Sequence, residues 1–558
     1  MTISNPASAT LGPITTAGAS AQRLPRAVRA AMPVALDVVV EAAKQNGVCT
    51  RPLEFERLDL HGGRTERVLI PCGARLASVC EPCARRAATL RRAQCREGWH
   101  LEAEPVADRD VPTDRQVFLA TERADAQQLL DRAHQDGGDT ATYQEVVELL
   151  DGDLNAAGVR GRLALEAPAR RARSTRRRQD APDLPRRRVE PRTVGRTYTG
   201  ADGRGYRPSL FITLTCDTYG KVRSDGTPVD PDTYDYVRAA RDAIHFPKLI
   251  DRFVQNLRRV AGFDVQYFAT VEPQRRLAPH LHLAMRGTMP RADVKAVAAA
   301  TYHQVWWPSA DVVRFAGDRL PVWADGAGYL DPDTGEVLPT WDEALDDLDD
   351  DPDAVPFHVV KLGPQVDVKG VLAGSPNAGR CLSYLSKYLT KSVADCHEPG
   401  TDAQRRHVER LMDVLRYEPC SPSCPNWLRY GVQPKDPKPG MAPGRCRGKA
   451  HKPAHLGYAG RRVLVSRKWS GKTLAEHKAD RRAWVLEQLG LAAAPDHDPD
   501  RFLWRPVEPG SPKASPLAAR LLRALADRQR WRAQLQAAQA RADGQPPSDV
   551  SGARMEAA

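Results

Sequence analysis

Hydrophobic and polar residues alternate with two different periods in the centre of the chain. Ser209–Thr215 (SLFITLT) is rich in apolar and β-branched residues and predicts a buried strand, whereas Tyr236–Arg259 repeats its apolar residues at helical spacing. Val265–Val271 and His280–Met285 predict two more strands. The intervening Glu272–Pro279 contains two prolines and predicts the connection between them.

The same alternation continues as far as residue 392. It predicts a helix over Arg291–Trp306, a strand over Phe357–Val368 and a helix over Arg380–Ser392. The resulting order of strands and helices predicts an α+β fold with a central antiparallel sheet and helices flanking it on one side. A dense aspartate run, Trp341–Asp353, predicts an acidic surface insertion at 340–354, or simply a solvated loop.

Changes in composition divide the rest of the chain. The start is rich in Ala, Ser, Thr and Pro without a sustained period, so it buries too little apolar surface to offset its ordering entropy. Arg170–Arg188 contains nine arginines and is either solvated or bound to phosphate. The expected segments are 1–33 disordered, 34–100 a small module ending in a basic helix, 101–196 an arginine-rich linker or insertion with at most a short helix at 143–154, 197–395 the core, 396–475 a second small module, and 476–558 a basic helical tail.

Charge and cysteine content narrow the class of partner. The 558 residues include 82 Lys plus Arg against 70 Asp plus Glu, a formal charge of +12, which favours a polyanionic partner such as nucleic acid, or marks a merely basic protein. No run of 18 apolar residues and no signal peptide are present, so we expect a cytoplasmic protein without a membrane partner. The eleven cysteines are clustered, which in a reducing compartment indicates metal sites rather than disulfides.

The strand at His280–Met285 carries a candidate metal site. Successive side chains of a strand point to opposite faces, so His280 and His282 face one side and can bind one ion. Glu272, eight residues before His280, returns beside the pair if the two strands form a hairpin. Two imidazoles and one carboxylate leave open positions on a divalent cation such as Mn²⁺ or Mg²⁺, although a Zn²⁺ hydrolase uses similar ligands and a lone histidine pair is often structural.

The last predicted helix of the core carries two tyrosines and two lysines on one face. Tyr384, Lys387, Tyr388 and Lys391 follow i, i+3, i+4 and i+7 spacing. Buried lysines are costly, so the face is either functional or a solvent-facing stripe. A phenol with a pKa near 10 attacks phosphate well only when a cation stabilises the phenolate, and both lysines are placed for that. Helix geometry does not separate the two tyrosines, and Tyr388 is only slightly preferred as the first nucleophile.

Two cysteine clusters have spacings typical of structural zinc. The first consists of Cys49, Cys72, Cys80 and Cys83. The second consists of Cys420, Cys424 and Cys446 with His451 or His455, while Cys396 and His397 are possible substitutes. A small proline-rich module without a sizeable core commonly needs such a metal, although thiols scattered in a loop stay an alternative.

Three of these segments together resemble a known superfamily. Phe211-Ile-Thr-Leu-Thr215, Pro279-His-Leu-His282 and Tyr384-Leu-Ser-Lys-Tyr388 resemble motifs one to three of the HUH endonucleases that start rolling-circle replication, and the paired tyrosines are similar to those of phage gene A proteins. The sequence outside the motifs, including 426–474, resembles the RepSA-type initiators of actinobacterial plasmids and integrative elements. The resemblance covers roughly 45–100 and 170–475 and leaves the role of 102–169 open.

The resemblance implies a fold, a reaction and partners. It implies a ferredoxin-like HUH core in which His280, His282 and Glu272 hold the divalent metal while Tyr388 or Tyr384 attacks the scissile phosphate. The product is a 5′-phosphotyrosine and a free 3′-OH that primes a host polymerase, and the second tyrosine then cuts and rejoins the displaced strand. The implied substrate is single-stranded or hairpin origin DNA, with duplex origin contacts from the basic modules and a host helicase as a further partner.

Two other functions fit the same residues. A conjugative relaxase or HUH transposase shares the metal and the nucleophile but acts on a transfer origin or an element end. A zinc-stabilised DNA-binding regulator without catalysis explains the charge and the cysteines alone. A covalent protein–DNA adduct separates the regulator from the two enzymes, and autonomous plasmid replication separates the initiator from the relaxase.

Overall fold

The structure of the protein, a computed structural model, describes residues 35–105, 111–159, 178–201, 203, 205–372, 375–387, 389–390, 399–458, 462–488 and 501–542. The predicted disordered start, part of the arginine-rich stretch and the end of the predicted tail lie outside these residues. The chain divides into two compact units, one formed by 1–72 and 496–537 and the other by 73–495 and 538–558.

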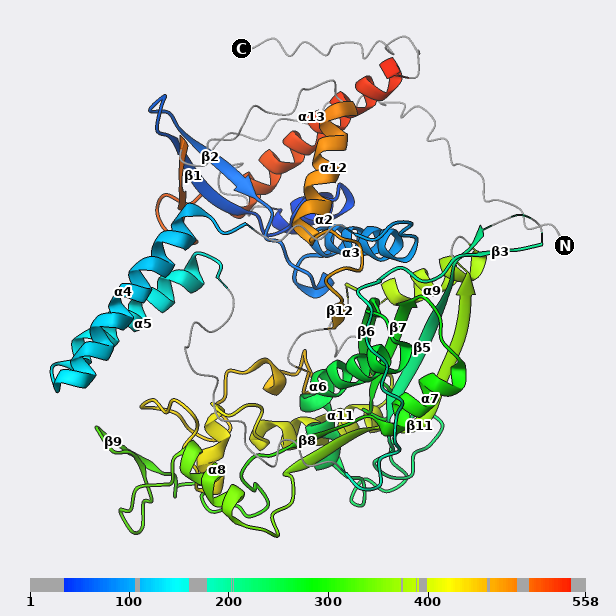
Figure 1. Ribbon diagram of the computed structural model, residues 1–558. Helices are drawn as coiled ribbons and strands as arrows, with labels where there is room; N and C mark the ends of the chain where they lie inside the picture. Colours follow the sequence, from blue (N-terminus) through cyan, green and yellow to red (C-terminus); the bar gives the residue numbers. More distant parts are fainter. Residues whose placement is uncertain are drawn as a thin grey trace. The chain divides into compact units, whose positions relative to one another are not determined.

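A six-stranded antiparallel sheet organises the larger unit (Figure 1). Its central strands read as near-continuous apolar runs because both of their faces are covered. The order across the sheet is β12-β6-β7-β5-β11-β8. The bounds are β5 Pro208–Cys216, β6 Tyr267–Pro273, β7 Pro279–Arg286, β8 Tyr302–Val305, β11 His358–Leu372 and β12 Val463–Val465. The predicted mixed α and β fold with an antiparallel central sheet is confirmed.

One face of this sheet packs on two helices, α6 (Tyr236–Ala261) and α7 (Arg291–Ala300). The side chain of Asp235 accepts the amide of Arg238 and caps the start of α6, and Gly262 ends it in the left-handed conformation that glycine adopts without strain. The apolar stripe of α6 is buried against alternate residues of β5 and β7 and forms the main core.

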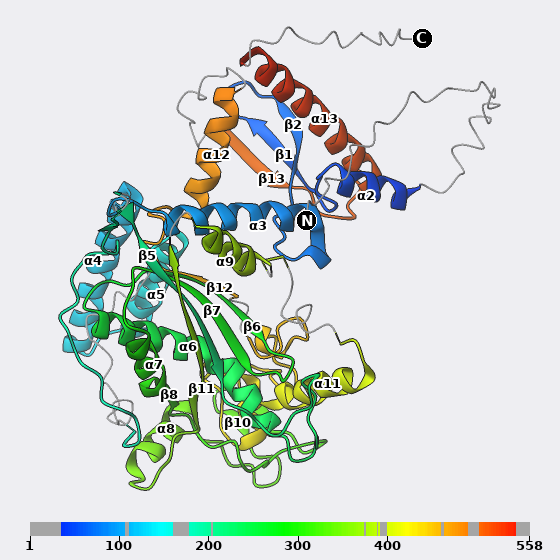
Figure 2. The same ribbon diagram turned by 90° about the vertical axis from the view of Figure 1, so that its right-hand side faces the viewer.

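The opposite face packs on α3 (Ala77–Trp99) and α9 (Pro376–Ser386), which lie next to each other in Figure 2. Phe211 and Ala284 point to this side from β5 and β7, one residue out of phase with the main core. Trp469 is fully buried here as well. The prediction of helices on one side only was therefore wrong, because α3 comes from a segment outside the predicted core.

Several element boundaries differ from those predicted. The predicted helix Arg291–Trp306 ends at Ala300, because the next four residues pair with β11 as β8. The acidic insertion is not a loop but contains helix α8 (Trp341–Asp350), whose N-terminus has a capping box between Thr340 and Glu343. The predicted helix Arg380–Ser392 begins earlier, at Pro376, and its described part ends at Ser386.

The segment predicted as a linker, 101–196, contains two antiparallel helices (Figure 1). They are α4 (Asp114–Asp136) and α5 (Thr140–Ala156), which pack through Ala126, Leu130 and Val147. Only a few of their apolar side chains are buried in this contact, and others such as Phe118 and Leu149 stay exposed, so the apolar residues do not form one clear helical stripe. The short helix predicted at 143–154 lies within α5.

Smaller elements complete the larger unit. Helix α11 contacts α6, and the buried ion pair between Arg241 Nε and Glu418 Oε1, 2.6 Å long, joins α6 to the segment just after α11. The bounds are α11 Asp402–Tyr417, η2 Pro425–Tyr430, η3 Lys449–His451, α12 Leu474–Gln488, β3 Tyr198–Thr199, β4 Gly205–Tyr206, β9 Val322–Ala324 and β10 Gly328–Leu330.

The smaller unit is built around a three-stranded antiparallel sheet of order β13-β1-β2. Its central strand, near the start of the chain, pairs with a strand more than 400 residues later, which the sequence did not predict. The predicted C-terminal helix is confirmed as α13, which packs on α2 through Leu521 and Ala43. The bounds are α2 Leu36–Gln45, β1 Leu53–Asp59, β2 Thr65–Ile70, β13 Phe502–Pro506 and α13 Leu517–Ala542.

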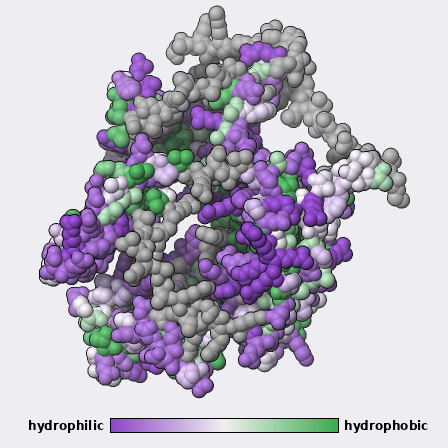
Figure 3. Space-filling model, in the orientation of Figure 1, coloured by the Kyte–Doolittle hydropathy of each residue, from purple (hydrophilic) through white to green (hydrophobic). Residues whose placement is uncertain are grey.

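The described residues also show how apolar side chains are distributed along the helices and over one face of the molecule. None of their helices combines the length and the apolarity that a membrane crossing requires. The face shown in Figure 3 is mainly hydrophilic, with small separate hydrophobic patches.

Replacing Gly98 with alanine should loosen the attachment of α3 to the sheet. A Cβ at Gly98 would overlap the indole of Trp469 and come within 2.5 Å of its carbonyl oxygen. That carbonyl and the carbonyl of Gly98 both accept hydrogen bonds from the buried Arg286 guanidinium, so neither segment moves easily. Overpacking of this kind costs about 1–3 kcal/mol. Urea unfolding should show this loss for Gly98→Ala and almost none for Gly152→Ala, where a Cβ meets nothing.

The buried His245 on α6 should make the stability of the larger unit pH-dependent. Burial, together with His358, His303 and Arg241, holds the pKa of His245 well below its ordinary value. The folded state then binds fewer protons than the unfolded chain, so this contribution is present above the unfolded pKa of about 6.5 and is lost as the pH falls below it.

The matching measurement is the free energy of urea unfolding at about pH 7.5 and about pH 5.5, for the wild type and His245→Phe. We expect the wild type to lose more stability on acidification, by up to about 1.4 kcal/mol per pH unit. Parallel profiles for the two proteins would contradict this assignment.

Candidate active site

The register of three neighbouring strands brings the predicted metal ligands together. Thr215 of β5 and Glu272 of β6 both pair with His280 of β7, and Thr213 pairs with His282 two residues further along. All five side chains therefore share the face of the sheet that carries α3 and α9. Ligand atoms of Glu272, His280 and His282 lie within 4.8 Å of one another.

Hydrogen bonds fix the orientation of both imidazoles. The hydroxyl of Thr213 lies 3.1 Å from Nδ1 of His282, and the hydroxyl of Thr215 lies 2.7 Å from Nδ1 of His280. Nε2 of His282 lies 3.1 Å from Oε1 of Glu272. When each Nδ1 donates to its threonine, the lone pair of each Nε2 is left for an ion, which is the usual arrangement around metal-bound histidines.

The local electrostatics favour a neutral imidazole at His280, which is the form that binds metal. Burial, with His282 and Arg276 nearby, lowers the pKa of His280 to about 4, although Glu272 acts in the opposite direction. The side chain of Glu272 is almost fully buried, and a buried carboxylate is costly unless it is paired or binds a cation. The three side chains thus fit a divalent cation held by two nitrogens and one oxygen.

The turn between β6 and β7 is held rigidly beside these ligands. Leu277 adopts a left-handed conformation with φ 64°, which is strained for a branched residue and ends the tight turn. The guanidinium of Arg276 donates to the carbonyls of Cys216 and Asp217 and to the side chain of Gln274. Gln274 in turn lies 3.4 Å from Nδ1 of His280. The turn therefore fixes the spacing between Glu272 and His280.

One of the predicted tyrosines lies directly against the histidine pair. The Tyr384 ring lies edge-on to the ring of His282, with 4.5 Å between the centroids. Phe211 contacts both rings. Its ring stacks on that of His282 with 5.8 Å between the centroids, and it meets the ring of Tyr384 edge-on with 6.3 Å between the centroids. The ring of Tyr384 is 41% exposed, so it is held in place yet open to a substrate.

The remaining residues of the tyrosine motif are only partly described. Lys387 is exposed, caps the C-terminus of α9 and lines the same surface hollow as Tyr384, together with Arg380 and Ser383. Tyr388 and Lys391 lie outside the described residues. Leu389 and Thr390 form a turn, so the prediction of one continuous helical face through residue 391 does not hold over the described part.

A second hollow includes two of the candidate ligands in its lining. Glu272 and His280 line it together with the β6–β7 turn and a neighbouring loop that contains Arg223 and Gly226. Arg275 is exposed there, whereas Arg223 donates to backbone carbonyls of its own loop. One hollow thus adjoins the candidate metal ligands and the other adjoins Tyr384, and both are lined by arginine side chains.

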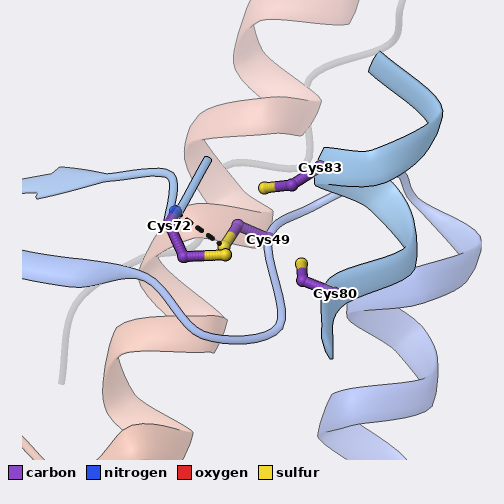
Figure 4. Close-up of side chains that lie close together, drawn as sticks. All are labelled: Cys49, Cys72, Cys80 and Cys83. Carbon is purple, nitrogen blue, oxygen red and sulfur yellow. Dashed lines mark hydrogen bonds between the residues drawn. The ribbon is translucent and has the colours of Figure 1, made fainter. Parts of the chain in front are cut away.

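The first cysteine cluster has the predicted composition. Cys49, Cys72, Cys80 and Cys83 bring their sulfur atoms within 4.8 Å of one another (Figure 4). Backbone amides of Arg51 and Cys72 donate to the sulfur of Cys49 at 3.4 and 3.3 Å. Such amide hydrogen bonds favour the thiolate form that a metal requires. Four thiolates in this arrangement suit a structural ion such as zinc.

The second cluster is also assembled, with His451 rather than His455. The ligand atoms of Cys420, Cys424, Cys446 and His451 lie within 4.8 Å of one another. Nδ1 of His451 lies 2.6 Å from the carbonyl of Leu415 and donates to it, which leaves Nε2 facing Cys424 at 3.6 Å. A Cβ at Gly448 would come within 3.1–3.4 Å of three candidate ligands, so any other residue there would have to displace them by a few tenths of an ångström. This cluster, too, suits structural zinc.

A comparison with family models identifies the family of the chain. Residues 35–543 match the family model RepSA, described as the replication initiator protein of pSAM2. The chain belongs to the RepSA family of replication initiators. Members of this family initiate plasmid replication, and the match spans both units and both cysteine clusters.

A curated relative carries the same description. A replication initiator protein from Streptomyces ambofaciens is 27% identical over 363 residues, covering 57% of this chain and 70% of the relative. No solved structure matches the chain. The resemblance to RepSA-type initiators that the sequence outside the motifs indicated is therefore confirmed, and replication initiation implies binding of origin DNA.

Sequence reasoning missed the residues that support the ligands. Thr213, Thr215 and Phe211 were identified only as parts of a motif, and Gln274 and Arg276 were not identified at all. The alternation of β5 offered one signal, because residues 211, 213 and 215 share a face. Their distance from the histidines depends on strand pairing, which the sequence does not reveal.

Proposed function

We propose that this RepSA family member is a DNA nicking-joining endonuclease that starts rolling-circle replication. The proposal rests on one observation, the edge contact between Tyr384 and His282 within the group Glu272, His280 and His282. A nucleophile and a candidate metal site in contact form the arrangement that phosphoryl transfer to a tyrosine requires.

In this proposal Glu272, His280 and His282 hold Mn²⁺ or Mg²⁺ through one carboxylate oxygen and two Nε2 atoms. When bound, such a cation polarises the scissile phosphate as a Lewis acid. Thr213 and Thr215 keep the imidazoles in the tautomer that presents Nε2. Phe211 packs against His282 and Tyr384 and keeps the two rings in contact.

The bond changes assigned to Tyr384 are a single displacement. Its phenol loses a proton to solvent, and the ammonium group of Lys387 stabilises the phenolate, which forms a bond to phosphorus. The P–O3′ bond breaks, and the 3′ oxygen takes up a proton from water to become the primer hydroxyl. Tyr388 and Lys391 are assigned the second cut and rejoining of the displaced strand.

The other parts have supporting roles in this proposal. Residues 197–395 form the catalytic core, and the zinc-stabilised modules at 34–100 and 396–475 contact duplex origin DNA through their basic residues. A host helicase and a host polymerase then extend the 3′ end. The strand cut at the nick is single-stranded or extruded as a hairpin, because paired and stacked DNA does not reach a site of this kind.

The test uses overlapping single strands of the noncoding DNA that flanks the gene, incubated with the full chain and Mn²⁺. A 5′-phosphotyrosine link predicts that a label at the 3′ end of the oligonucleotide stays with the protein on a denaturing gel, whereas a 5′ label is released. Tyr384→Phe should remove the first adduct, and the double variant with Tyr388→Phe should remove all adducts.

Tyr198→Phe is the matched control, because Tyr198 is 52% exposed and lies on β3, outside the site. An adduct that survives in the double variant, or the absence of any adduct on every strand, would contradict the proposal. Conjugative transfer without autonomous replication would instead assign the same chemistry to a relaxase.

A further inference from the structure

The small sheet of the unit formed by 1–72 and 496–537 carries a row of aromatic and arginine side chains at its surface, of which Trp504 is exposed and the others are half-buried. Register pairs Arg57 with Trp504 and Phe55 with Pro506, so the side chains of Phe55, Arg57, Phe502 and Trp504 lie on one face. We call these four residues the aromatic ladder. Trp504 is 40% exposed, and Leu53 on the same face is 45% exposed.

The rings and the guanidinium group of the ladder contact one another. Phe55 and Trp504 meet edge to face, with 6.4 Å between centroids. The guanidinium of Arg57 lies over Phe502 at 4.6 Å and near Trp504 at 5.7 Å, and Arg501 lies over Phe502 at 5.1 Å. These ring–ring and cation–π contacts hold the four side chains in a fixed geometry at the surface.

The opposite face of the sheet already has its packing partner. Glu54 is buried there and accepts hydrogen bonds from the amide and the hydroxyl of Ser515, just before α13. Arg67 on the same side contacts Glu54 and Ser515. The ladder therefore lies on the face of the sheet that α13 does not cover. Apolar groups at the surface of this kind commonly mark a binding surface.

The chemistry of the ladder fits the bases of single-stranded DNA. Aromatic rings interleaved with arginine stack on bases of any sequence, and arginine adds a cation–π contribution. The two carboxylates on this face, Asp59 and Glu66, are neutralised by ion pairs with Arg501 and Arg57. Helix α13, on the other face of the sheet, adds five arginines against one aspartate within this unit and so makes the unit more attractive to a polyanion: Arg520, Arg523, Arg528, Arg530 and Arg532.

We propose that the aromatic ladder is a second, sequence-tolerant binding site for single-stranded DNA, separate from the Tyr384 site. It would hold the strand displaced during replication. This inference extends the proposed function, but it does not depend on catalysis, since neither His282 nor Tyr384 belongs to the ladder.

Binding is measured by fluorescence anisotropy with the full chain and a labelled oligothymidylate of about 16 nucleotides, without added Mn²⁺. Trp504→Ala should raise the Kd about tenfold or more, while Trp504→Phe, which keeps a ring, should restore most of the affinity. The control is Trp531→Ala, because Trp531 lies on α13, is 50% exposed and lies outside the ladder. Zinc content and circular dichroism verify that each variant is folded.

A second readout keeps the proposal independent of variant folding. Photocrosslinking of the wild type to oligothymidylate that contains 5-bromodeoxyuridine should label peptides with Phe55 or Trp504. Unchanged affinity in Trp504→Ala together with crosslinks confined to 205–390 would overturn the proposal. A change in oligomeric state without a change in DNA affinity would overturn it too, because the ladder would then join protein copies.

The ladder and the catalytic proposal fail in distinguishable ways. Trp504→Ala should still form the adduct on short origin oligonucleotides, whereas His282→Ala should lose the adduct yet bind oligothymidylate through the ladder. Loss of both activities in either variant would contradict two separate sites.

Discussion

Replacing His282 with alanine is expected to reduce Mn²⁺-dependent adduct formation by about a thousandfold or more. A bound cation contributes several kcal/mol to such a reaction, and 1.36 kcal/mol corresponds to a factor of ten in rate. His282 does more than supply one ligand atom, because its ring also contacts Tyr384 and Phe211. Its loss therefore affects both the metal and the position of the nucleophile.

A graded comparison separates these two roles. Thr213→Val keeps the shape of the side chain but removes the hydroxyl that holds Nδ1 of His282. Loss of a partner of this kind typically weakens metal binding 10–100-fold, so excess Mn²⁺ should restore activity in Thr213→Val but not in His282→Ala. The control is His61→Ala, at an exposed position in another unit. Adduct formation in His282→Ala within about tenfold of the wild type would contradict the assignment.

Loss of the second cysteine cluster should unfold the segment around it. Structural zinc contributes apparent binding free energies of roughly 10–16 kcal/mol near neutral pH, more than a small module without a large core obtains from packing. Cys424 is buried in the cluster and packs beside Trp427. We expect Cys424→Ser to lose about one zinc ion per chain and to become sensitive to proteolysis within 399–458.

Elemental analysis by mass spectrometry and limited proteolysis check this expectation. Cys381→Ser is the control, because Cys381 lies on α9 and belongs to neither cluster. Zinc content equal to that of the wild type in Cys424→Ser would show that the cluster does not hold the ion.

The cluster of Glu272, His280 and His282 was predictable because it depends only on neighbouring residues. A strand with a histidine at alternate positions and a hairpin of fixed length bring Glu272 back beside His280 without any knowledge of the remaining fold. The cysteine clusters follow the same principle, since ligand type and spacing restrict a metal site more than secondary structure does.

Elements that depend on distant partners were not predictable in this way. β8 is a strand because Tyr302–Val305 pairs with β11, and this pairing overrides the helical pattern of the preceding residues. β13 pairs with β1 across most of the chain, and nothing in either segment specifies the other. Helix α4 did offer a local signal, the capping box between Thr113 and Gln116, but its polar composition suggested a linker.

The most direct test identifies the residue that carries the DNA. Trypsin cleaves after Arg380, Lys387 and Lys391, so Tyr384 and Tyr388 fall on separate peptides, 381–387 and 388–391. After Mn²⁺-dependent reaction with origin DNA and nuclease digestion, mass spectrometry should find a nucleotide phosphate on the Tyr384 peptide. After the second cut, a nucleotide phosphate should also be found on the Tyr388 peptide. A nucleotide on neither peptide, or attachment to a residue away from His282, would contradict the account.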